Sequence, residues 1–384
     1  MATLRALVVP SGPSAQSMLA VVGDMLDGRR PPLLPVPGDD PRQCEMLTDA
    51  LRVGQDIDDD VAVVVPTSGT TGTPKGAMLS TRALIASASA THDRLGGEGT
   101  WLLALPTHHI AGLQVLVRSV LAGTVPVELD TTYGFDPAGL AVAVAAMGSG
   151  RRYASLVAAQ LAGCLNDRDA IAALSDLDAV LLGGGPAPAR VLEDAAAADI
   201  SVVRTYGMSE TAGGCVYDGR PLDGVEVRVD DDGRIALGGA TLANGYRNPP
   251  IPDPFAEPGW FRTDDVGALD DSGSLRVLGR VDDAISTGGL TVLPQPVESA
   301  LASHPAVADC AVFGVADDRL GQRVVAAVVL RPGVAEPGLE ELRAHVAATL
   351  PRTAAPRQIH VVEELPRLGI GKVDRRALVT RFGP

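Results

Sequence analysis

The fold is decided by the sequence VAVVVPTSGTTGTPKG, which occupies residues 61–76. The apolar, β-branched run at Val61–Val65 is typical of a buried strand, and the Ala-rich pattern at Leu79–Leu95 is typical of a helix. Between them, glycines, serine and threonines can surround an anion with backbone N–H groups and hydroxyls. A flexible linker has a similar composition, but linkers do not usually interrupt a strand–helix unit. We therefore interpret residues 67–76 as a phosphate-binding loop.

The same strand–helix alternation continues along the chain. Further strand-like runs lie at Trp101–Leu105, Val125–Leu129, Ala179–Leu182 and Ser201–Arg204. Helical patterns lie at Leu113–Leu121, Gly139–Met147 and Arg190–Ala198. This alternation predicts an α/β fold, in which a large N-terminal domain combines mixed or parallel sheets with helices.

The pattern of predicted secondary structure then changes twice. From Val225, short strands with Asp-Gly and Ser-Gly turns predict a β subdomain at about residues 218–278, with the Pro-rich loop Asn248–Pro258 inside it. Past Gly279, the runs predict a small α+β unit, with helices at Val297–Ser303 and Leu339–Leu350 and strands at Val307–Val315, Val324–Leu330 and Gln358–Val362. We expect an N-terminal domain at 1–280 and a mobile C-terminal domain at 281–384.

Composition excludes several classes of protein. The 384 residues carry 32 Lys plus Arg against 47 Asp plus Glu, a formal charge of −15, which disfavours nucleic acid and anionic membranes as partners. No apolar run approaches the roughly 18 residues that span a bilayer, and the first residues lack the apolar core of an export signal. The four cysteines have no metal or redox spacing and predict a reducing compartment. A cytoplasmic protein is expected.

Lysine is almost absent. Of the 32 basic residues only Lys75 and Lys372 are lysines, which leaves 30 arginines. Arginine cannot replace lysine where a compact point charge must reach one oxygen, so both lysines are candidates for chemistry. Chance survival on the surface is the alternative for each.

Five ordered blocks resemble the adenylate-forming superfamily, which includes acyl-CoA synthetases, luciferases and peptide-synthetase adenylation domains. The blocks are the loop at 67–76, TYGMSET at 205–211, WFRTDD at 260–265, GRVDD at 279–283 with GG at 288–289, and LPRLGIGK at 365–372 with Arg376. The resemblance covers nearly everything from Val61 onward. It departs at Asp264, where the family has glycine, and at Arg367-Leu368, where the family has Lys-Thr.

The resemblance implies a binding site for ATP and Mg²⁺. The implied ATP-binding residues are Thr67, Ser68, Gly69, Thr70, Thr71, Gly72, Lys75, Gly184, Gly185, Pro186, Thr205, Tyr206, Gly207, Ser209, Asp265 and Arg280. Glu210 is implied as the Mg²⁺ ligand, and magnesium on a triphosphate usually needs only one or two protein carboxylates. The ring of Tyr206 suits a purine, while Asp265 and Arg280 suit ribose hydroxyls. From the residues alone, a core tyrosine and two solvated charges remain alternatives.

The C-terminal blocks imply a catalytic lysine on a moving domain. By resemblance, Lys372 bridges the substrate carboxylate and the α-phosphate, and a mobile cation suits the negative charge that develops there. The resemblance also implies a hinge at Asp282 and a CoA-side loop with Gly288 and Gly289. The sequence itself supports only a short charged linker between two foldable units.

The block LPTHHIAGLQVLVR at 105–118 is implied to border the acyl pocket and the thiol tunnel. His109 takes the position of the family's catalytic histidine, although tandem histidines are otherwise more often structural. His109, Arg118 and Ser209 are candidates for contacting the acid, and Arg118 in a structural ion pair is an equal alternative.

The implied reaction consumes a small carboxylic acid, ATP and coenzyme A, and forms an acyl-adenylate and then a thioester. The 108–118 run and TYGMSET are most similar to the superfamily members that act on o-succinylbenzoate in menaquinone biosynthesis. Another aryl or fatty acid, a carrier-loading adenylation enzyme and a non-catalytic nucleotide sensor remain alternatives. A P-loop ATPase is disfavoured because Lys75 is followed by Gly76. The oligomeric state is left open, with a homodimer among the alternatives.

Overall fold

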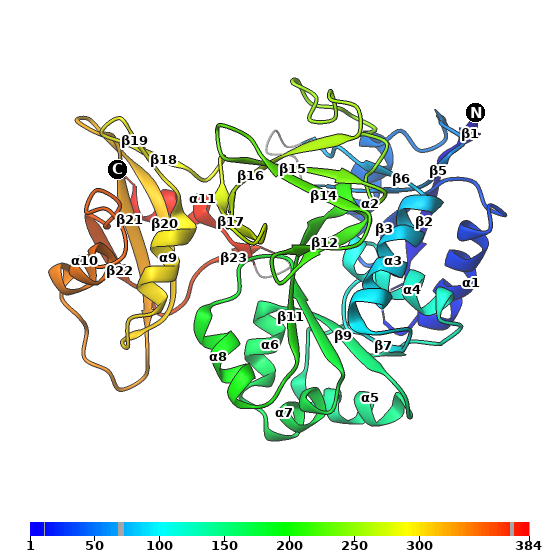
Figure 1. Cartoon of the computed structure of the whole chain (residues 1–384), viewed down its shortest axis with the longest axis horizontal. Coiled ribbons are helices and arrows are strands. Elements are labelled where there is room, and N and C mark those ends of the chain that lie inside the picture. Colours follow the sequence, from blue (N-terminus) through cyan, green and yellow to red (C-terminus); the bar gives the residue numbers. More distant parts are fainter. Residues whose placement is uncertain (11, 68–72, 369–371, 384) are drawn as a thin grey trace. The chain divides into compact units, whose positions relative to one another are not determined.

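A computed structural model describes residues 1–10, 12–67, 73–368 and 372–383 of the chain (Figure 1). The chain forms two compact units. The first unit comprises Met1–Gly184, Ala195–Arg228 and Ala236–Thr263. The second unit comprises Gly185–Asp194, Val229–Ile235 and Asp264–Pro384. These units are defined by contacts within the structure and do not test which part of the chain moves. The expected N-terminal domain at 1–280 and mobile C-terminal domain at 281–384 therefore stay a prediction.

A seven-stranded mixed sheet organises the first unit, in the order β13-β12-β11-β10-β9-β7-β8. Its strands are β7 (Thr100–Leu103), β8 (Val127–Glu128), β9 (Arg152–Val157), β10 (Ala179–Gly183), β11 (Val202–Met208), β12 (Gly213–Tyr217) and β13 (Arg220–Pro221). Neighbours from β8 to β11 are parallel, whereas β12 and β13 are antiparallel. Parallel strands that carry apolar residues on both faces must be covered by helices, as the alternation predicts.

A second sheet of the first unit carries the phosphate-loop segment, in the order β2-β3-β5-β6. Its strands are β2 (Arg5–Val9), β3 (Leu33–Pro37), β5 (Val61–Val65) and β6 (Ala77–Ser80), and β1 (Ala2–Thr3) pairs separately with β4 (Asp56–Ile57). The helical elements of this unit are α1 (Ala15–Leu26), α2 (Pro41–Ala50), α3 (Thr81–Leu95), α4 (Ile110–Leu121), η1 (Pro137–Gly139), α5 (Leu140–Ala146), α6 (Ala158–Cys164), α7 (Arg168–Ser175) and η2 (Ser209–Thr211).

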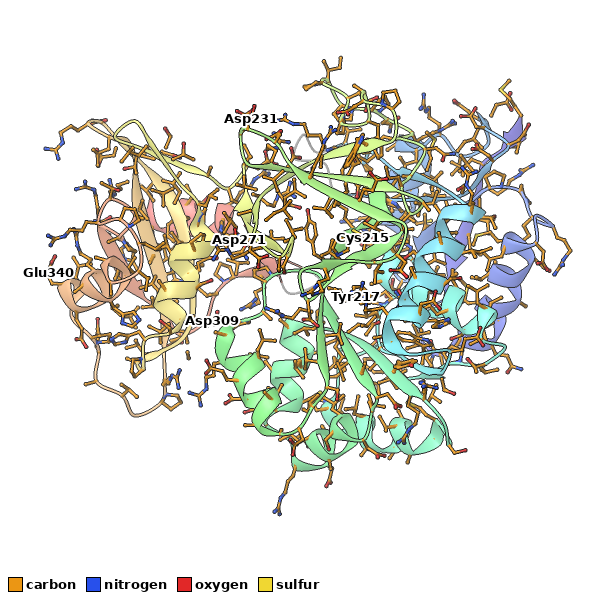
Figure 2. The ribbon with its side chains drawn as sticks, viewed as in Figure 1. Cys215, Tyr217, Asp231, Asp271, Asp309 and Glu340 are labelled. Atoms are coloured by element: carbon orange, nitrogen blue, oxygen red, sulfur yellow. The ribbon has the colours of Figure 1, made fainter. Side chains whose placement is uncertain are left out.

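The core of the first unit lies where α1, α3 and α4 pack together beside these sheets (Figure 1). Trp101 on β7, Tyr153 on β9 and Tyr217 on β12 are its largest fully buried side chains. Figure 2 labels Tyr217 and, on the same strand, Cys215. Burial raises the pKa of the Cys215 thiol to about 12, so this cysteine is an unreactive core residue.

Four further strands form the expected β subdomain, in the order β14-β15-β16-β17. They are β14 (Val225–Val229), β15 (Arg234–Gly239), β16 (Trp260–Leu269) and β17 (Leu275–Arg280). The predicted turns at Gly233 and Gly273 have positive φ angles, +78° and +75°, which glycine adopts without strain. Helix α8 (Ala189–Ala197) precedes β11 in the chain.

The C-terminal part of the second unit is the expected α+β fold. A sheet in the order β19-β18-β21-β20, with β22 beside β21, contains β18 (Ile285–Thr287), β19 (Leu290–Val292), β20 (Val307–Asp317), β21 (Gly321–Leu330) and β22 (Gln358–Val361). The other elements are α9 (Pro294–Ala302), α10 (Leu339–Ala347), the hairpin β23 (Arg367–Leu368) and β24 (Lys372–Val373), and α11 (Arg375–Phe382). Alternate residues of β21 enter two apolar clusters, one with α9 and α10 and the other with α11.

Some sequence predictions about elements were wrong or incomplete. The helix expected from Leu79 begins at Thr81, because residues 77–80 pair with β5 as a strand and the Ser80 hydroxyl accepts the N–H of Ala83 at 3.2 Å as the N-cap. Strand β9 was not expected, although it is central to the sheet. No helix among the described residues is long and apolar enough to cross a membrane.

Candidate active site

The phosphate-loop segment begins at the end of the buried strand β5. Of its predicted residues, Ser68, Gly69, Thr70, Thr71 and Gly72 lie outside the described residues. Thr67 is described, and its Oγ1 atom is buried with no hydrogen-bond partner among the described residues. A buried hydroxyl without a partner is unfavourable, and it marks a place where a polar ligand would be satisfied.

A segment distant in sequence closes the other end of this loop. Backbone hydrogen bonds join Asn248 N–H to the Lys75 carbonyl, Arg247 N–H to the Gly76 carbonyl, and Met78 N–H to the Gly245 carbonyl, at 2.9, 2.9 and 3.0 Å. Gly76 has φ +72°, and a Cβ there would lie 2.6 Å from Leu51 Cδ2, so this close approach requires glycine. Residues 244–248 therefore run alongside the segment that begins at Lys75.

Tyr246 links Lys75 to Glu210. Its phenol hydroxyl donates to Glu210 Oε1 at 2.5 Å, and Lys75 Nζ lies 5.3 Å from the centroid of its ring. Glu210 is buried on η2, and its backbone carbonyl accepts the N–H of Ala243 at 2.9 Å. The predicted phosphate-binding lysine and the predicted Mg²⁺ ligand, 135 residues apart in the sequence, are thus connected through one side chain.

Sequence reasoning missed Tyr246. The signal available was an aromatic residue in the sequence NGYRN at 244–248, just before the Pro-rich loop, but no local periodicity marks that segment as a strand partner. Its pairing with residues 75–78 is a long-range contact, which a local pattern does not encode.

The predicted purine-binding residues lie on and after β11. The strand expected to end at Arg204 continues to Met208, so Thr205, Tyr206 and Gly207 are strand residues, with a register irregularity between Tyr206 and Gly207. A Cβ at Gly207 would lie 2.1 Å from the Gly213 carbonyl oxygen, so only glycine fits. Ser209 follows on η2.

Thr205 joins β11 to the end of β10. The Thr205 hydroxyl donates to the Leu182 carbonyl at 3.3 Å. A Cβ at Gly183 would lie 2.5 Å from Thr205 Oγ1, which explains the glycine there. Gly184 follows with φ +82° in the first unit, whereas Gly185 and Pro186 belong to the second unit.

The predicted ribose-binding pair is formed within the second unit. Asp265 on β16 is the register partner of Arg280 on β17, and Arg280 Nη1 lies 3.4 Å from Asp265 Oδ1. Arg280 Nη2 also lies 3.1 Å from the predicted hinge residue Asp282 and 3.6 Å from Asp264. Burial by itself lowers the pKa of Arg280, but Asp265, Asp282 and Asp264 outweigh it and raise that pKa above its ordinary value. Arg280 is therefore a cation that contacts three carboxylates.

The tandem histidines stand at the start of α4. His109 is the N-cap residue of the helix, and its ring centroid lies 4.3 Å from that of His108. Burial, followed by the neighbouring His109, lowers the pKa of His108 to about 4. His108 is therefore neutral near pH 7 and supplies no cation for a substrate carboxylate.

Arg118 lies in the core of the first unit. Its side chain is 3% exposed, and its guanidinium carbon lies 4.7 Å from the centroid of the Trp101 ring. Burial lowers the pKa of Arg118, with an opposing contribution from Tyr217. Among the described residues no carboxylate acts on the pKa of Arg118, and its Nε has no hydrogen-bond partner. The ion-pair alternative is not observed, and the acyl-pocket role stays a prediction.

The C-terminal predictions lie on two hairpins. Gly288 and Gly289, with φ +59° and +78°, form the two-residue turn between β18 and β19, where positive φ at both positions favours glycine. Lys372 begins β24 and pairs with Leu368, while residues 369–371 lie outside the described residues. Arg367, one of the departures from the family pattern, donates to Asp309 on β20 at 2.5 Å.

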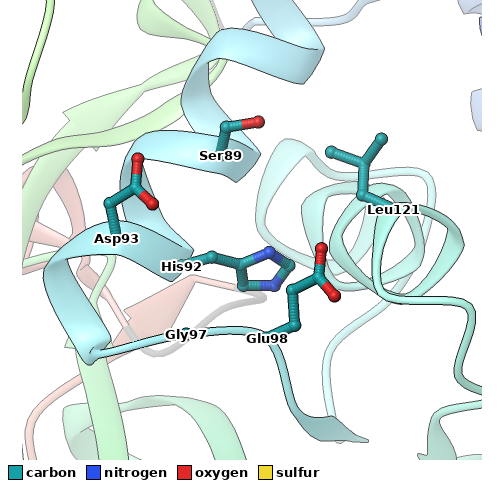
Figure 3. Close-up of a pocket in the computed structure, with 6 residues that line it drawn as sticks. All are labelled: Ser89, His92, Asp93, Gly97, Glu98 and Leu121. Atoms are coloured by element: carbon teal, nitrogen blue, oxygen red, sulfur yellow. The ribbon is translucent and has the colours of Figure 1, made fainter.

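A pocket of ≈ 250 Å³ lies between α3, the loop after it and α4 (Figure 3). It is lined by Ser89, His92, Asp93, Gly97, Glu98 and Leu121. None of the predicted site residues lines it, and its two acidic side chains disfavour an anionic acid. The predicted site residues therefore lie outside this pocket.

Comparisons with known proteins agree with the resemblance to the adenylate-forming superfamily. Residues 20–247 match the AMP-binding enzyme family, and residues 296–372 match the AMP-binding enzyme C-terminal domain. A probable 2-succinylbenzoate–CoA ligase of Mycobacterium tuberculosis (strain ATCC 25618 / H37Rv) is 68% identical over 381 residues, 99% of this chain and 98% of that protein. The 2-succinylbenzoate–CoA ligase of Geobacillus kaustophilus is 36% identical over 344 residues, 83% of this chain and 69% of that protein.

Solved structures are similar in fold. The o-succinylbenzoate CoA synthetase of Bacillus subtilis, in complex with the acyl-adenylate intermediate, has a TM-score of 0.75 at 26% identity, covering 98% of this chain and 88% of that chain. The same synthetase in complex with ATP and a magnesium ion has a TM-score of 0.74 at 26% identity, covering 98% and 89%. The mixed α/β fold class predicted from the sequence is confirmed.

Proposed function

The chain belongs to the AMP-binding enzyme family, and from this premise we propose that it is an ATP-dependent acid–thiol ligase that converts o-succinylbenzoate to o-succinylbenzoyl-CoA. The observation that carries the proposal is the 68% identity, over 98% of its length, to the probable 2-succinylbenzoate–CoA ligase. Its substrates are then a carboxylic acid, ATP and CoA, its place is menaquinone biosynthesis, and a cytoplasmic location fits that substrate set. The roles of individual residues below are part of the same proposal.

The first half-reaction forms the acyl-adenylate. A carboxylate oxygen of the acid attacks the α-phosphorus of ATP, the new oxygen–phosphorus bond forms, and the bond to pyrophosphate breaks. Both reactants are anions, so the ammonium of Lys372 stabilises the negative charge that develops between them. Lys75 binds the phosphates, while Asp265 and Arg280 orient the ribose for in-line attack.

The described residues fit a magnesium ion. Glu210 offers a buried carboxylate, a hard oxygen ligand, and Thr67 Oγ1 is a buried hydroxyl with no hydrogen-bond partner among the described residues. The described residues contain no cluster of three or more His, Cys, Asp or Glu side chains, which suits an ion that takes its remaining ligands from phosphates and water. When bound, Mg²⁺ would neutralise charge on the phosphate oxygens.

The second half-reaction forms the thioester. The CoA sulfur attacks the carbonyl carbon of the adenylate, a carbon–sulfur bond forms, and the carbon–oxygen bond to AMP breaks. We assign the Gly288–Gly289 turn to the CoA side and Asp282 to the hinge between the two half-reactions. The contacts of Asp282 with Arg280 put the proposed hinge and the proposed ribose site in one hydrogen-bonded group.

The acid pocket must satisfy two carboxylates. His109 and Ser209 are the proposed contacts, since His109 is the N-cap residue of α4 and Ser209 directly precedes Glu210. His108 is neutral near pH 7, so it can act only as a hydrogen-bonding group.

The test follows AMP and thioester formation with o-succinylbenzoate, benzoate and a fatty acid, each with and without CoA. The proposal expects AMP and thioester in equal amounts with o-succinylbenzoate, and only when CoA is present. Equal rates with all three acids would contradict the substrate assignment. Pyrophosphate exchange with o-succinylbenzoate but no AMP release on addition of CoA would favour a carrier-loading enzyme, because its adenylate then lacks a thiol acceptor. Neither pyrophosphate exchange nor AMP with any acid would favour a nucleotide sensor.

A further inference from the structure

Tyr246 occupies a position that the reaction scheme above leaves unused. It is 6% exposed, and its ring packs edge-on against Phe255 and Phe261, at centroid distances of 5.3 and 6.4 Å. Its backbone forms a bridge with Ala77 at the start of β6, and hydrogen bonds hold the residues on either side. The ring is therefore fixed on one side by aromatic packing and along the chain by strand pairing.

The polar end of this fixed ring meets the Glu210 carboxylate. The hydroxyl donates to Glu210 Oε1 at 2.5 Å, and both residues are buried. A hydrogen bond to an ionised acceptor in a buried place is stronger than a neutral one, and it restricts the rotation of the carboxylate. The N–H of Ala243 binds the backbone carbonyl of Glu210 at 2.9 Å, so both the backbone and the side chain of Glu210 contact the 243–246 segment.

The face of the same ring meets Lys75. Its Nζ lies 5.3 Å from the ring centroid, within the range at which an aromatic face attracts an ammonium group. The Lys75 backbone is held by the same segment, through the Asn248 N–H. One side chain thus sets the relative position of a cation and a carboxylate that are both assigned to the triphosphate.

We propose that Tyr246 is a positioning residue, which orients the Glu210 carboxylate toward the divalent cation of the bound nucleotide and holds the Lys75 ammonium in register with it. The inference rests on the proposed function, because it needs Glu210 to be the metal ligand. It goes beyond that function by naming a residue outside the five sequence blocks. In this proposal Tyr246 acts through Glu210 and Lys75, the two residues that its hydroxyl and its ring contact.

The variant Tyr246→Phe separates the two contacts. Phenylalanine keeps the ring, and with it the packing on Phe255 and the face under Lys75, but removes the hydroxyl. Partners that orient a metal ligand typically contribute 10–100-fold in metal affinity, so we expect Mn²⁺ to bind about tenfold more weakly. Affinity for the nucleotide without metal should stay within about twofold, because the Lys75 contact is retained.

The experiment uses the complete chain with Mn²⁺ and a non-hydrolysable ATP analogue, and counts free Mn²⁺ by electron paramagnetic resonance. Neither the acid nor CoA is present, so the result does not depend on the identity of the acid. Tyr153→Phe is the matched control, because it also removes a buried phenol hydroxyl, one that donates to the carbonyls of Leu95 and Gly97. Its Mn²⁺ affinity should equal that of the wild type.

A double-mutant cycle with Glu210→Gln tests whether Tyr246 affects Mn²⁺ binding through Glu210. If Tyr246 acts through Glu210, Tyr246→Phe weakens Mn²⁺ binding in the wild type but not in the Glu210→Gln background. Equal Mn²⁺ affinity of Tyr246→Phe and wild type would overturn the proposal, and so would additive losses in the double variant. A lowered melting temperature with unchanged Mn²⁺ affinity would also overturn it, because the role would then be structural only.

The proposed function fails in a different way. If the wild-type protein binds no Mn²⁺–nucleotide complex, Glu210 is not a metal ligand and both ideas fall. If it binds the complex but releases no AMP with o-succinylbenzoate, only the substrate assignment fails, and the double-mutant cycle still decides the role of Tyr246.

Discussion

Arg118→Met is the perturbation that decides between the two roles open to Arg118. This arginine is almost fully buried in the last turn of α4, over the Trp101 ring, and the described residues offer it no ion pair. Methionine keeps an unbranched apolar stem of similar length and removes the charge. If the residue belongs to the core, the protein should tolerate this change. If the residue binds the second carboxylate of the acid, catalysis should suffer.

The expected magnitude follows from two opposing contributions. The buried Nε without a hydrogen bond destabilises the native state by about 1–3 kcal/mol, and the variant relieves this. The contact with the Trp101 ring stabilises it by up to about 2 kcal/mol when desolvated, and the variant loses this. We therefore expect the free energy of unfolding to change by less than about 1 kcal/mol, whereas breaking a buried ion pair lowers it by about 3–5 kcal/mol.

Urea unfolding and the KM for o-succinylbenzoate are the two measurements. We expect the KM to change less than about threefold, because a lost charge-assisted hydrogen bond of about 1.5–3 kcal/mol would raise it about 10- to 150-fold. Arg152→Met is the control for an arginine that has a partner, since Arg152 Nη2 lies 3.0 Å from Asp176. A tenfold higher KM for Arg118→Met at unchanged stability would refute the core role and place Arg118 in the acyl pocket.

Three further variants test the remaining assignments. Lys372→Ala should slow adenylate formation by about two to three decades, measured by pyrophosphate exchange, yet leave thioester formation from preformed adenylate within about threefold; equal loss in both would contradict its role. Asp282→Pro should spare pyrophosphate exchange and impair thioester formation, and parallel losses would argue against a hinge there. His108→Gln tests how protonation of His108 affects stability. The pKa of His108 is lowered from 6.5 to about 4 in the folded protein, so as the pH falls the unfolded chain binds a proton at this residue before the folded protein does. His108 then contributes stability that is present above about pH 6.5 and is lost as the pH falls toward 4. Wild type should therefore lose about 1 kcal/mol more than the variant between about pH 7.5 and 5.5 in urea unfolding, after allowance for partial exposure, and equal losses would exclude this titration.

The sequence pattern predicted those strands and helices whose burial follows from their own residues. The run Val61–Val65 is a buried strand because five β-branched or small apolar residues have no polar face, and the pattern of apolar residues also predicted helices α3, α4 and α5. The strand β9 was missed because RYASLV has polar residues at both faces of an isolated strand, and only its place between β7 and β10 buries it. The segment 244–248 was missed for the same reason, since its order comes from pairing with residues 75–78.

The two departures from the family pattern, at Asp264 and at Arg367-Leu368, also show what a local pattern cannot predict. Asp264 places a carboxylate where the family has glycine, and the structure supplies its counter-charge: Arg234 Nη2 lies 2.7 Å from Asp264 Oδ1. Arg367 likewise pairs with Asp309. Each partner is distant in sequence, by 30 and 58 residues, so neither compensation could be predicted from the motif. Asp264 also lies 3.6 Å from Arg280 Nη2, so the added carboxylate shares this arginine with Asp265, whose Oδ1 atom lies 3.4 Å from Arg280 Nη1.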